Sequence, residues 1–400
     1  MALTSLTEAL ASILARAKTI EDPEHRNLSK ALGCVLAEQV CASVAVPPDD
    51  NSAMDGYALR SADGDSTREI TQRITAGSCG TEVAPGTAAR IFTGAPVPPG
   101  ADAVIMQENC QVQGATLAVS GTIEPGQNIR ARGQDIEAGS VVFNAGTRLR
   151  PQDLGVLASV GLDAVSVRRP LRVAVMSTGD ELVEPGAGAL RPGQIFNSNR
   201  YTLAGLLQSM GAEMLDYGIV PDTAQATGDR LELAAQSADC VITTGGVSVG
   251  EEDHVKSQVE LRGTLDLWKL RIKPGKPLAF GSIAGVPFFG LPGNPGAVFV
   301  TFNLLVRPFL MRCQGVADVA PLRIAVAAGF DWPRPGSREE YLRVRVERDG
   351  DNVVANVHQN QSSGVLSSAS WSNALAILYP GMTVVRGDVL EVILLSEFNA

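Results

Sequence analysis

A glycine-rich turn directly after an apolar strand is the segment of the sequence best suited to bind a ligand. Residues 240–243 are apolar or β-branched, and Thr244, Gly245, Gly246 and Ser248 follow them. The two glycines allow a tight turn and a close approach of the backbone to a ligand. Hydroxyls, backbone N–H groups and the positive end of a following helix would suit a phosphate or another oxyanion. The spacing matches neither a P-loop nor a dinucleotide fingerprint, so a tight turn without a ligand is an alternative.

Carboxylates follow this turn and would repel a bare anion. They are Glu251, Glu252 and Asp253, while Asp180 and Glu181 stand at the end of another expected strand. A divalent cation between carboxylate and phosphate oxygens would remove the repulsion, because hard cations take oxygen ligands from both. The alternative is that these acidic groups cap helix starts.

Two lysines supply the opposite charge. Lys273 and Lys276 flank Pro274 and Gly275. Because proline fixes φ and glycine permits a sharp bend, the two ammonium groups can converge on one oxyanion. The alternative is a solvated surface turn.

Alternating strands and helices would position these three segments. From residue 171 the pattern predicts a parallel sheet covered by helices on both faces. In such a sheet, ligands bind outside the carboxyl ends of the strands. The loops 177–182, 243–253 and 288–297 are therefore expected to meet there, and Pro295 is expected to open a long apolar helix over 294–315.

The segments before and after this sheet have a different predicted secondary structure. Residues 4–18 predict a helix capped by Thr4, and a second helix is expected over 27–40. The chain is thus predicted to be multidomain, α/β plus β, with a three-layer α/β/α centre. The expected domains are a discontinuous helical linker (1–43 and 145–170), a β-rich domain (44–144), the α/β domain (171–316) and a small all-β, barrel-like domain (317–400).

Composition limits the class of protein. The 400 residues carry a net charge of −10, which argues against nucleic-acid binding because phosphate contacts need a basic surface. The six cysteines are scattered without metal-ligand spacing, so they are expected to be reduced. We find no secretory signal and no membrane-spanning segment, and we expect a cytoplasmic protein.

Three further loops are unusual. They are the small, polar segment around Asp55, the turn at Thr93, and the segment 128–136 that contains Asp135. Each loop taken alone fits an ordinary structural role.

Seven segments taken together resemble one family. They are "NSAMDGYA", "TGAPVPPGADAVIMQE", "RARGQDI", "STGDEL", "TTGGVSVGEEDHVK", "IKPGKP" and "GLPGNP". In this order they are similar to the molybdopterin molybdenumtransferase family, which includes MoeA-like proteins and the C-terminal region of gephyrin. The resemblance covers nearly the whole chain.

The resemblance implies an enzyme of molybdenum cofactor biosynthesis with a three-layer molybdopterin-binding domain. Such an enzyme inserts molybdenum from molybdate into the dithiolene of adenylylated molybdopterin. It hydrolyses the adenylyl bond, releases AMP and needs a divalent cation, usually Mg²⁺. Its members are homodimers whose active site lies between the α/β domain of one subunit and the N-terminal β domain of the other.

The resemblance also implies roles for individual residues. The implied catalytic residues are Asp55, Asp180, Glu181, Asp253, Lys273 and Lys276, with Asp180, Glu181 and Asp253 as metal ligands. The implied substrate-binding residues are Thr93, Asp135, Asp222, Thr244, Gly245, Gly246, Ser248, Pro292, Asn294, Arg343 and Ser363. Of these, Asp55, Thr93 and Asp135 would come from the partner subunit.

The expected partners follow from the same resemblance. We expect no adenylyltransferase domain beside this chain. A separate adenylyltransferase is therefore expected to supply the pterin, and molybdoenzymes to receive the product. Gly296 departs from the bulkier residue of many relatives. A non-catalytic scaffold and a pyrophosphate hydrolase are the alternatives. The retained acidic and lysine residues argue against the first, and the "NSAMDGYA" domain argues against the second.

Overall fold

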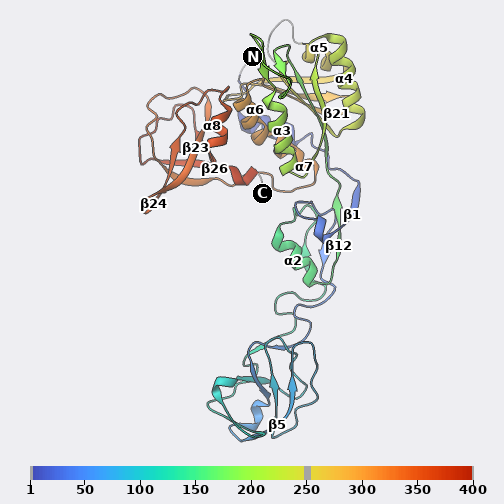
Figure 1. The fold of residues 1–400 in the computed structure, drawn as a ribbon, viewed down its shortest axis with the longest axis vertical. Coiled ribbons are helices and arrows are strands. Elements are labelled where there is room, and N and C mark those ends of the chain that lie inside the picture. Colours follow the sequence, from blue (N-terminus) through green and yellow to red (C-terminus); the bar gives the residue numbers. More distant parts are fainter. Residues whose placement is uncertain (1–2, 247–253, 399–400) are drawn as a thin grey trace.

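The computed structural model describes residues 3–246 and 254–398, with the side chains of residues 267 and 268 excepted. Figure 1 shows an elongated molecule. An α/β body lies at one end with the C-terminal β unit beside it, and an arm leads from the body to a β-rich unit at the far end.

The body is built on a six-stranded sheet with the order β16-β13-β17-β21-β20-β18. The pairs β13–β16, β13–β17 and β17–β21 are parallel, whereas β20 pairs antiparallel with both β21 and β18. The prediction of a parallel sheet is therefore correct for β16, β13, β17 and β21 and wrong for the edge formed by β20 and β18. At that edge Ala284 and Gly285 close a tight hairpin between β20 and β21. The strands are β13 (Arg172–Thr178), β16 (Glu213–Val220), β17 (Cys240–Thr244), β18 (Gly263–Lys269), β20 (Pro277–Ile283) and β21 (Val286–Leu291).

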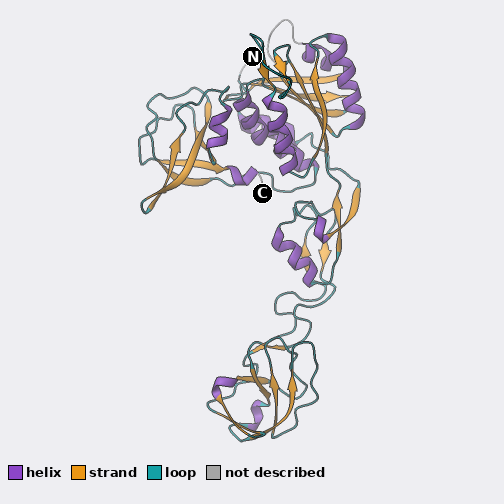
Figure 2. Ribbon diagram, in the orientation of Figure 1, coloured by secondary structure: helices purple, strands orange, loops and turns teal. Residues whose placement is uncertain are grey.

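Helices cover both faces of this sheet, as predicted (Figure 2). Alternate residues of β13 enter two separate cores, because successive side chains of a strand point to opposite faces. Val173 and Val175 pack in one core, while Ala174 and Met176 pack in the other. The first core contains α3 (Ser198–Ser209), α6 (Pro295–Thr301) and α7 (Arg307–Cys313). The second contains α4 (Ala224–Ser237) and α5 (His254–Arg262).

The expected long apolar helix is present as one continuous element. It runs through α6 (Pro295–Thr301), a π-helical segment (Phe302–Val306) and α7 (Arg307–Cys313). By length and composition this helix would be able to cross a membrane, but 89% of its apolar window is buried inside the protein. It is therefore the core helix of the body.

Two expectations for the N-terminal region need correction. Helix α1 (Leu6–Leu14) is capped by Ser5 in a capping box with Glu8, not by Thr4, and its buried residues pack in the core of the body. The helix expected over 27–40 is wrong. Only a 3₁₀ turn (Leu28–Lys30) forms, because Gly33 has a φ of +75° and the following backbone bonds to residues 147–149 and 166 instead.

The arm contains a two-stranded ribbon and a helix. β1 (Pro23–Asn27) pairs antiparallel with β12 (Ala164–Arg168), and α2 (Pro151–Ser159) begins at a proline as expected. A short ladder of β2 (Val40–Cys41) and β11 (Val141–Phe143) leads onward to the distal unit. The arm is thus made of two distant stretches of the chain that run side by side.

The distal unit is β-rich, as predicted. Its sheet has the order β7-β4-β6-β5-β9-β8, with small cores on both faces. The strands are β4 (Gly56–Leu59), β5 (Arg68–Ile74), β6 (Thr87–Ile91), β7 (Ala103–Met106), β8 (Cys110–Gln113) and β9 (Thr116–Val119), with the small ladder of β3 (Asn51–Ser52) and β10 (Ile129–Arg130) beside them.

The C-terminal unit is barrel-like, as predicted. Its strand order is β19-β23-β24-β22-β26-β25, and an extra pairing of β23 with β25 closes the sheet around a separate core. Short helix α8 (Leu366–Trp371) packs beside it. The strands are β19 (Ile272–Lys273), β22 (Ile324–Ala328), β23 (Glu339–Asp349), β24 (Asn352–Val357), β25 (Ala374–Leu378) and β26 (Val389–Leu394). Because β19 carries Lys273 and pairs with β23, the barrel is attached directly to the lysine turn.

Candidate functional site

Three strand ends meet at one edge of the body sheet, as the sequence predicts. β13 ends at Thr178, β17 at Thr244 and β21 at Leu291, and the three strands are neighbours. A cavity of about 640 Å³ opens beside the last two ends. Its wall comprises Gly245, Gly246, Lys273, Pro274, Gly275, Lys276, Pro277, Pro292, Gly293, Asn294, Ala297, Arg338, Gln361, Ser362 and Ser363.

The glycines of the turn are required by close contacts. Gly245 and Gly246 have φ values of +87° and +62°, which L side chains rarely adopt. A Cβ on Gly245 would lie 2.5 Å from the carbonyl oxygen of Thr178, and one on Gly246 would lie 2.5 Å from Cγ2 of Val255. The turn therefore presents bare backbone to the cavity, which is the property that binding of an oxyanion needs.

Both predicted lysines line this same cavity. Gly275 between them has a φ of +107°, and a Cβ there would lie 2.4 Å from Oγ1 of Thr301. The turn is closed by a 2.8 Å hydrogen bond from the N–H of Leu270 to the carbonyl of Lys276. Lys273 is not a free ammonium, because its Nζ lies 3.1 Å from Oε2 of the buried Glu340.

The barrel supplies the opposite wall. Ser363 accepts a 3.1 Å hydrogen bond from Nδ2 of Asn294 at its hydroxyl and a 2.8 Å bond from the N–H of Gly296 at its carbonyl. A Cβ on Gly296 would lie 2.8 Å from that carbonyl oxygen, so glycine allows the loop to sit close to helix α6. The structure thus brings Pro292, Asn294 and Ser363 together with the lysines.

Arg343 lies behind this wall and is absent from the cavity lining. Its side chain is 1% exposed and donates to Oγ of Ser368 at 3.0 Å and to the carbonyl of Ser362 at 3.1 Å. Its backbone N–H also donates to Oε1 of Gln361. Burial lowers the pKa of its guanidinium to about 10. Arg343 therefore holds the loop that lines the cavity.

A second cavity of about 520 Å³ adjoins the first and shares Gly245, Gly293 and Asn294 with it. Glu181, Thr178 and the first residues of α3 line it, while Asp180 lies in the exposed turn next to Glu181. The buried hydroxyl of Thr178 has no hydrogen-bond partner within residues 3–246 and 254–398. Together with Glu181 it offers oxygen donors of the kind that a hard divalent cation prefers.

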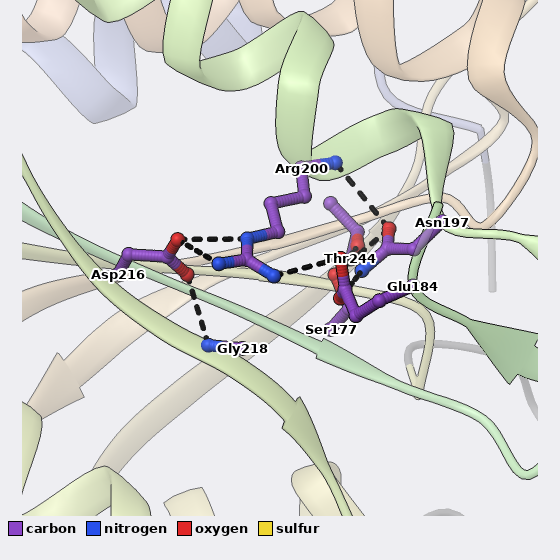
Figure 3. A network of polar contacts seen from close by, with 7 residues as sticks. All are labelled: Ser177, Glu184, Asn197, Arg200, Asp216, Gly218 and Thr244. Carbon is purple, nitrogen blue, oxygen red and sulfur yellow. Dashed lines mark hydrogen bonds and ion pairs between the residues drawn. The ribbon is translucent and has the colours of Figure 1, made fainter. Parts of the chain in front are cut away.

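A polar network holds the wall of the second cavity in place (Figure 3). Arg200 on α3 forms ion pairs with Asp216 on β16 and with Glu184, the latter at 2.7 Å. Nδ2 of Asn197 donates to Glu184 at 3.3 Å, and its Oδ1 accepts from Oγ of Ser177 at 3.3 Å.

The inner end of the same network is the hydroxyl of Thr244, which donates to Oγ of Ser177 at 3.1 Å. An unbroken chain of polar contacts thus connects the surface of the body to the strand end beside Gly245 (Figure 3). The loop that carries Glu181 is fixed between these two ends.

Besides Asp180 and Arg343, four further predicted residues among those described lie outside both cavity linings. Asp222 follows β16 at the same edge of the sheet and is exposed. Asp55, Thr93 and Asp135 are exposed on the distal unit, which Figure 1 places at the opposite end of the molecule. One carboxylate oxygen of Asp55 accepts 2.8 Å hydrogen bonds from both the N–H and the hydroxyl of Thr93. These bonds lower the pKa of Asp55 and keep it ionised.

The predicted Ser248, Glu251, Glu252 and Asp253 lie outside the described residues. Within residues 3–246 and 254–398, no three His, Cys, Asp or Glu side chains form a group that would hold a metal ion. The proposed metal ligands Asp180 and Glu181 therefore need further donors to complete a site.

Sequence reasoning missed three lining residues from the barrel, namely Arg338, Gln361 and Ser362. Arg338 begins the segment "REEYLRV", in which Arg343 is the predicted ligand. The strand pattern contained the missing signal. Arg343 lies within β23 among buried positions, whereas Arg338 immediately precedes that strand in a turn.

Comparison with known proteins gives a consistent result over the whole chain. Three family models match: the MoeA N-terminal region (domain I and II) over residues 4–161, a probable molybdopterin binding domain over 174–312, and the MoeA C-terminal region (domain IV) over 325–395. A molybdopterin molybdenumtransferase of Haemophilus influenzae is 43% identical, over 99% of each chain. Gephyrin of Dictyostelium discoideum is 30% identical over 99% of this chain and 63% of its own length.

Solved structures agree. The crystal structure of a molybdopterin biosynthesis moeA protein from Pyrococcus horikoshii superposes with a TM-score of 0.86 at 32% identity, over 98% of this chain and all of that one. Because the match spans body, arm, distal unit and barrel, the elongated arrangement is shared.

Proposed function

The chain belongs to the molybdopterin molybdenumtransferase family of molybdenum cofactor biosynthesis, and we propose that it transfers molybdenum from molybdate to adenylylated molybdopterin. In this reaction two dithiolene sulfurs replace oxygens of molybdate, and water cleaves the adenylyl phosphoanhydride with release of AMP. The observation that carries the proposal is one cavity in which a lysine pair faces the bare glycine turn at the end of β17.

The two adjoining cavities suit the two parts of this chemistry. Lys276 and Arg338 provide positive charge for a dianionic oxyanion before the sulfurs replace its oxygens, and Lys273, paired with Glu340, adds N–H donors. The second cavity offers Glu181, the Thr178 hydroxyl and the N-terminus of α3, which suit a phosphate group and its counter-ion. Their shared residues at 245 and 293–294 would place the adenylyl phosphate next to the molybdenum site.

Mg²⁺ is the divalent cation proposed for this second cavity. Asp180 and Glu181 would hold it together with Asp253. When bound, such an ion neutralises phosphate charge and polarises the bond to be cleaved. The chain's own contribution would be to hold the loop that carries Glu181, because Arg200 and Asn197 both contact Glu184 of that loop.

A homodimer is proposed because the predicted site residues occupy opposite ends of one chain. Asp55 and Thr93 sit on the distal unit, separated by the arm from the cavity of the same chain (Figure 1). Asp55 of the partner subunit would complete the site. The domain division proposed above fits this arrangement, with the arm as the spacer between two functional parts.

The remaining proposals concern the cellular context. We propose that a separate adenylyltransferase supplies the substrate, that molybdoenzymes accept the product, and that the protein acts in the cytoplasm.

The decisive experiment measures AMP release from purified protein with adenylylated molybdopterin, molybdate and Mg²⁺. AMP is expected to appear only when molybdate is present. Absence of molybdate-dependent AMP release would exclude the transferase and leave the scaffold as the better explanation.

A further inference from the structure

A third cavity lies next to the cavity that contains the lysine pair, and Lys273 borders both. It has a volume of about 550 Å³ and is formed by one loop of the barrel, residues 332–338, together with Lys273 and Glu340. Lys273 and Arg338 also line the inner cavity of about 640 Å³. The two cavities are therefore separated by a boundary at which both shared residues are cationic.

The charges of the outer cavity favour an anion. Glu340 is its only acidic lining residue among those described, and its carboxylate is already paired with Nζ of Lys273 at 3.1 Å. A Cβ on Gly336 would lie 2.4 Å from Oε1 of Glu340, so the loop wraps this carboxylate closely. With that pair counted as neutral, the guanidinium groups of Arg334 and Arg338 give the cavity a net positive charge.

The two arginines differ in how they are held. Nη1 of Arg338 donates to the carbonyl of Ile272 at 3.0 Å, which fixes its guanidinium at the boundary. A guanidinium has five N–H donors, so this single bond leaves donors for a ligand. Arg334 is exposed and lies between Pro333 and Pro335, which restrict the backbone that presents it.

We propose that this cavity is an outer oxyanion site, which captures molybdate and passes it across Lys273 and Arg338 to the inner cavity. The inference rests on the proposed transferase function. A tetrahedral dianion is small enough for both cavities and is attracted to guanidinium groups. Positive charge at the mouth of a site raises the local concentration of an anionic substrate. Arg334 thereby contributes to capture of molybdate without contacting the reacting atoms.

The test compares the molybdate dependence of AMP release in wild type and Arg334→Gln. The expected result is a rise of about fivefold in the KM for molybdate with kcat unchanged, because a partly exposed charge contributes modestly to affinity. Arg334→Lys should recover part of the loss. Arg348→Gln, at an exposed arginine elsewhere on the barrel, should match wild type and is the control for net charge.

Ionic strength and direct binding give independent readings. The KM of wild type for molybdate should rise more steeply with salt concentration than that of Arg334→Gln. Added sulfate should compete with molybdate less strongly than added tungstate does. Calorimetric titration of molybdate into each variant, without pterin, should show the same loss of affinity.

The outcomes separate the two proposals. If wild type releases no AMP, the transferase function fails, while the titration still tests the outer site. If wild type is active but Arg334→Gln has the same KM, salt dependence and binding as Arg348→Gln, the outer site is wrong. Competition by sulfate as strong as that by tungstate would show a general anion site and would overturn its assignment to molybdate.

Discussion

The body and the distal unit both carry predicted site residues but present them differently. In the body, residues from the sheet edge, the lysine turn and the barrel meet around one cavity, and the network of Arg200 holds the wall of the adjoining second cavity. On the distal unit, Asp55 is exposed and its carboxylate accepts hydrogen bonds from the N–H and the hydroxyl of Thr93. The body thus brings candidate residues from several elements to one cavity, whereas the distal unit offers one oriented carboxylate.

This difference indicates a division of labour. A cavity that must hold large substrates needs several elements fixed relative to one another, which a three-layer body provides. A single ionised carboxylate needs only a local turn and can stand at the end of an arm. Such a group is useful only if another chain brings a cavity to it, so the contrast itself supports a shared site.

Removal of the distal carboxylate should have the largest effect. Asp55→Ala is expected to lower kcat by about a hundredfold or more, the range for loss of a group that acts on a proton or a reacting atom. The midpoint of thermal unfolding should fall only slightly, because Asp55 is exposed and its loss removes just the two hydrogen bonds from Thr93. AMP release and calorimetry measure the two quantities, and normal turnover in this variant would remove Asp55 from the site.

Co-expression sharpens this result. A chain with Asp55→Ala and a chain with both Lys273→Ala and Lys276→Ala should each be inactive alone. Mixed dimers should recover part of the activity, since one of their two sites combines an intact cavity with an intact Asp55. If mixing restores nothing although mixed dimers form, the body and the distal unit do not share a site.

Within the body, the lysine that lacks a carboxylate partner among the described residues should matter next. Lys276→Ala is expected to raise the KM for molybdate by about tenfold, as for loss of a charge-assisted hydrogen bond to an oxyanion. Steady-state AMP release at varied molybdate measures it. Lys30→Ala, an exposed lysine of the arm, is the control, and an equal KM in both variants would contradict the oxyanion role.

The network behind the cavity should have a smaller effect. Arg200→Gln removes the ion pairs to Glu184 and Asp216 and should lower kcat/KM for adenylylated molybdopterin by about fivefold, since residues that act through others modulate a site by 0.5–2 kcal/mol. Hydrogen exchange of the segment that carries Glu181 should become faster. Arg230→Gln on α4 is the matched control, and unchanged exchange in Arg200→Gln would show that the network does not position this segment.

The same contrast explains what the sequence could predict. The loops at the ends of β13, β17 and β21 were predictable from three features: the periodicity of the hydrophobic residues, the length of the apolar runs and the turn residues after them. Together these features indicate parallel strands, whose carboxyl ends lie at one edge of a sheet. The antiparallel edge formed by β18 was not predicted, because a short apolar run fits a strand in either direction. The false helix over 27–40 shows how tertiary bridges to residues 147–149 override a helical pattern.

Side-chain roles were harder to predict than loops. Arg343 and Arg338 belong to one segment, and only the fold shows that the former is buried behind the wall while the latter lines it. The ion pair of Lys273 with Glu340 likewise depends on the parallel pairing of β19 with β23. No local sequence pattern predicts this pairing. Local spacing therefore located the candidate loops, and long-range packing decided which atoms face the cavity.

A substitution at the junction between body and arm should have the smallest effect on catalysis. Its effect on the free energy of unfolding should be measurable. Arg169, which follows β12, donates to both carboxylate oxygens of Asp239 at 2.7 and 2.8 Å. Burial raises the pKa of Asp239, but the bonds from Arg169 and from the N–H of Arg172 outweigh burial and leave it below the usual value.

A lowered folded-state pKa means that the ionised form stabilises the fold. Its contribution is present above the unfolded pKa of about 3.9 and is lost as pH falls through the lower folded-state value. Asp239→Asn should therefore reduce the free energy of unfolding by about 1–3 kcal/mol at pH 7, and the difference from wild type should shrink below about pH 4. Asp266→Asn, which breaks an exposed pair with Arg16, should change stability by less than about 1 kcal/mol. If Asp239→Asn costs as much at pH 3 as at pH 7, the ionised pair is not what joins the arm to the body.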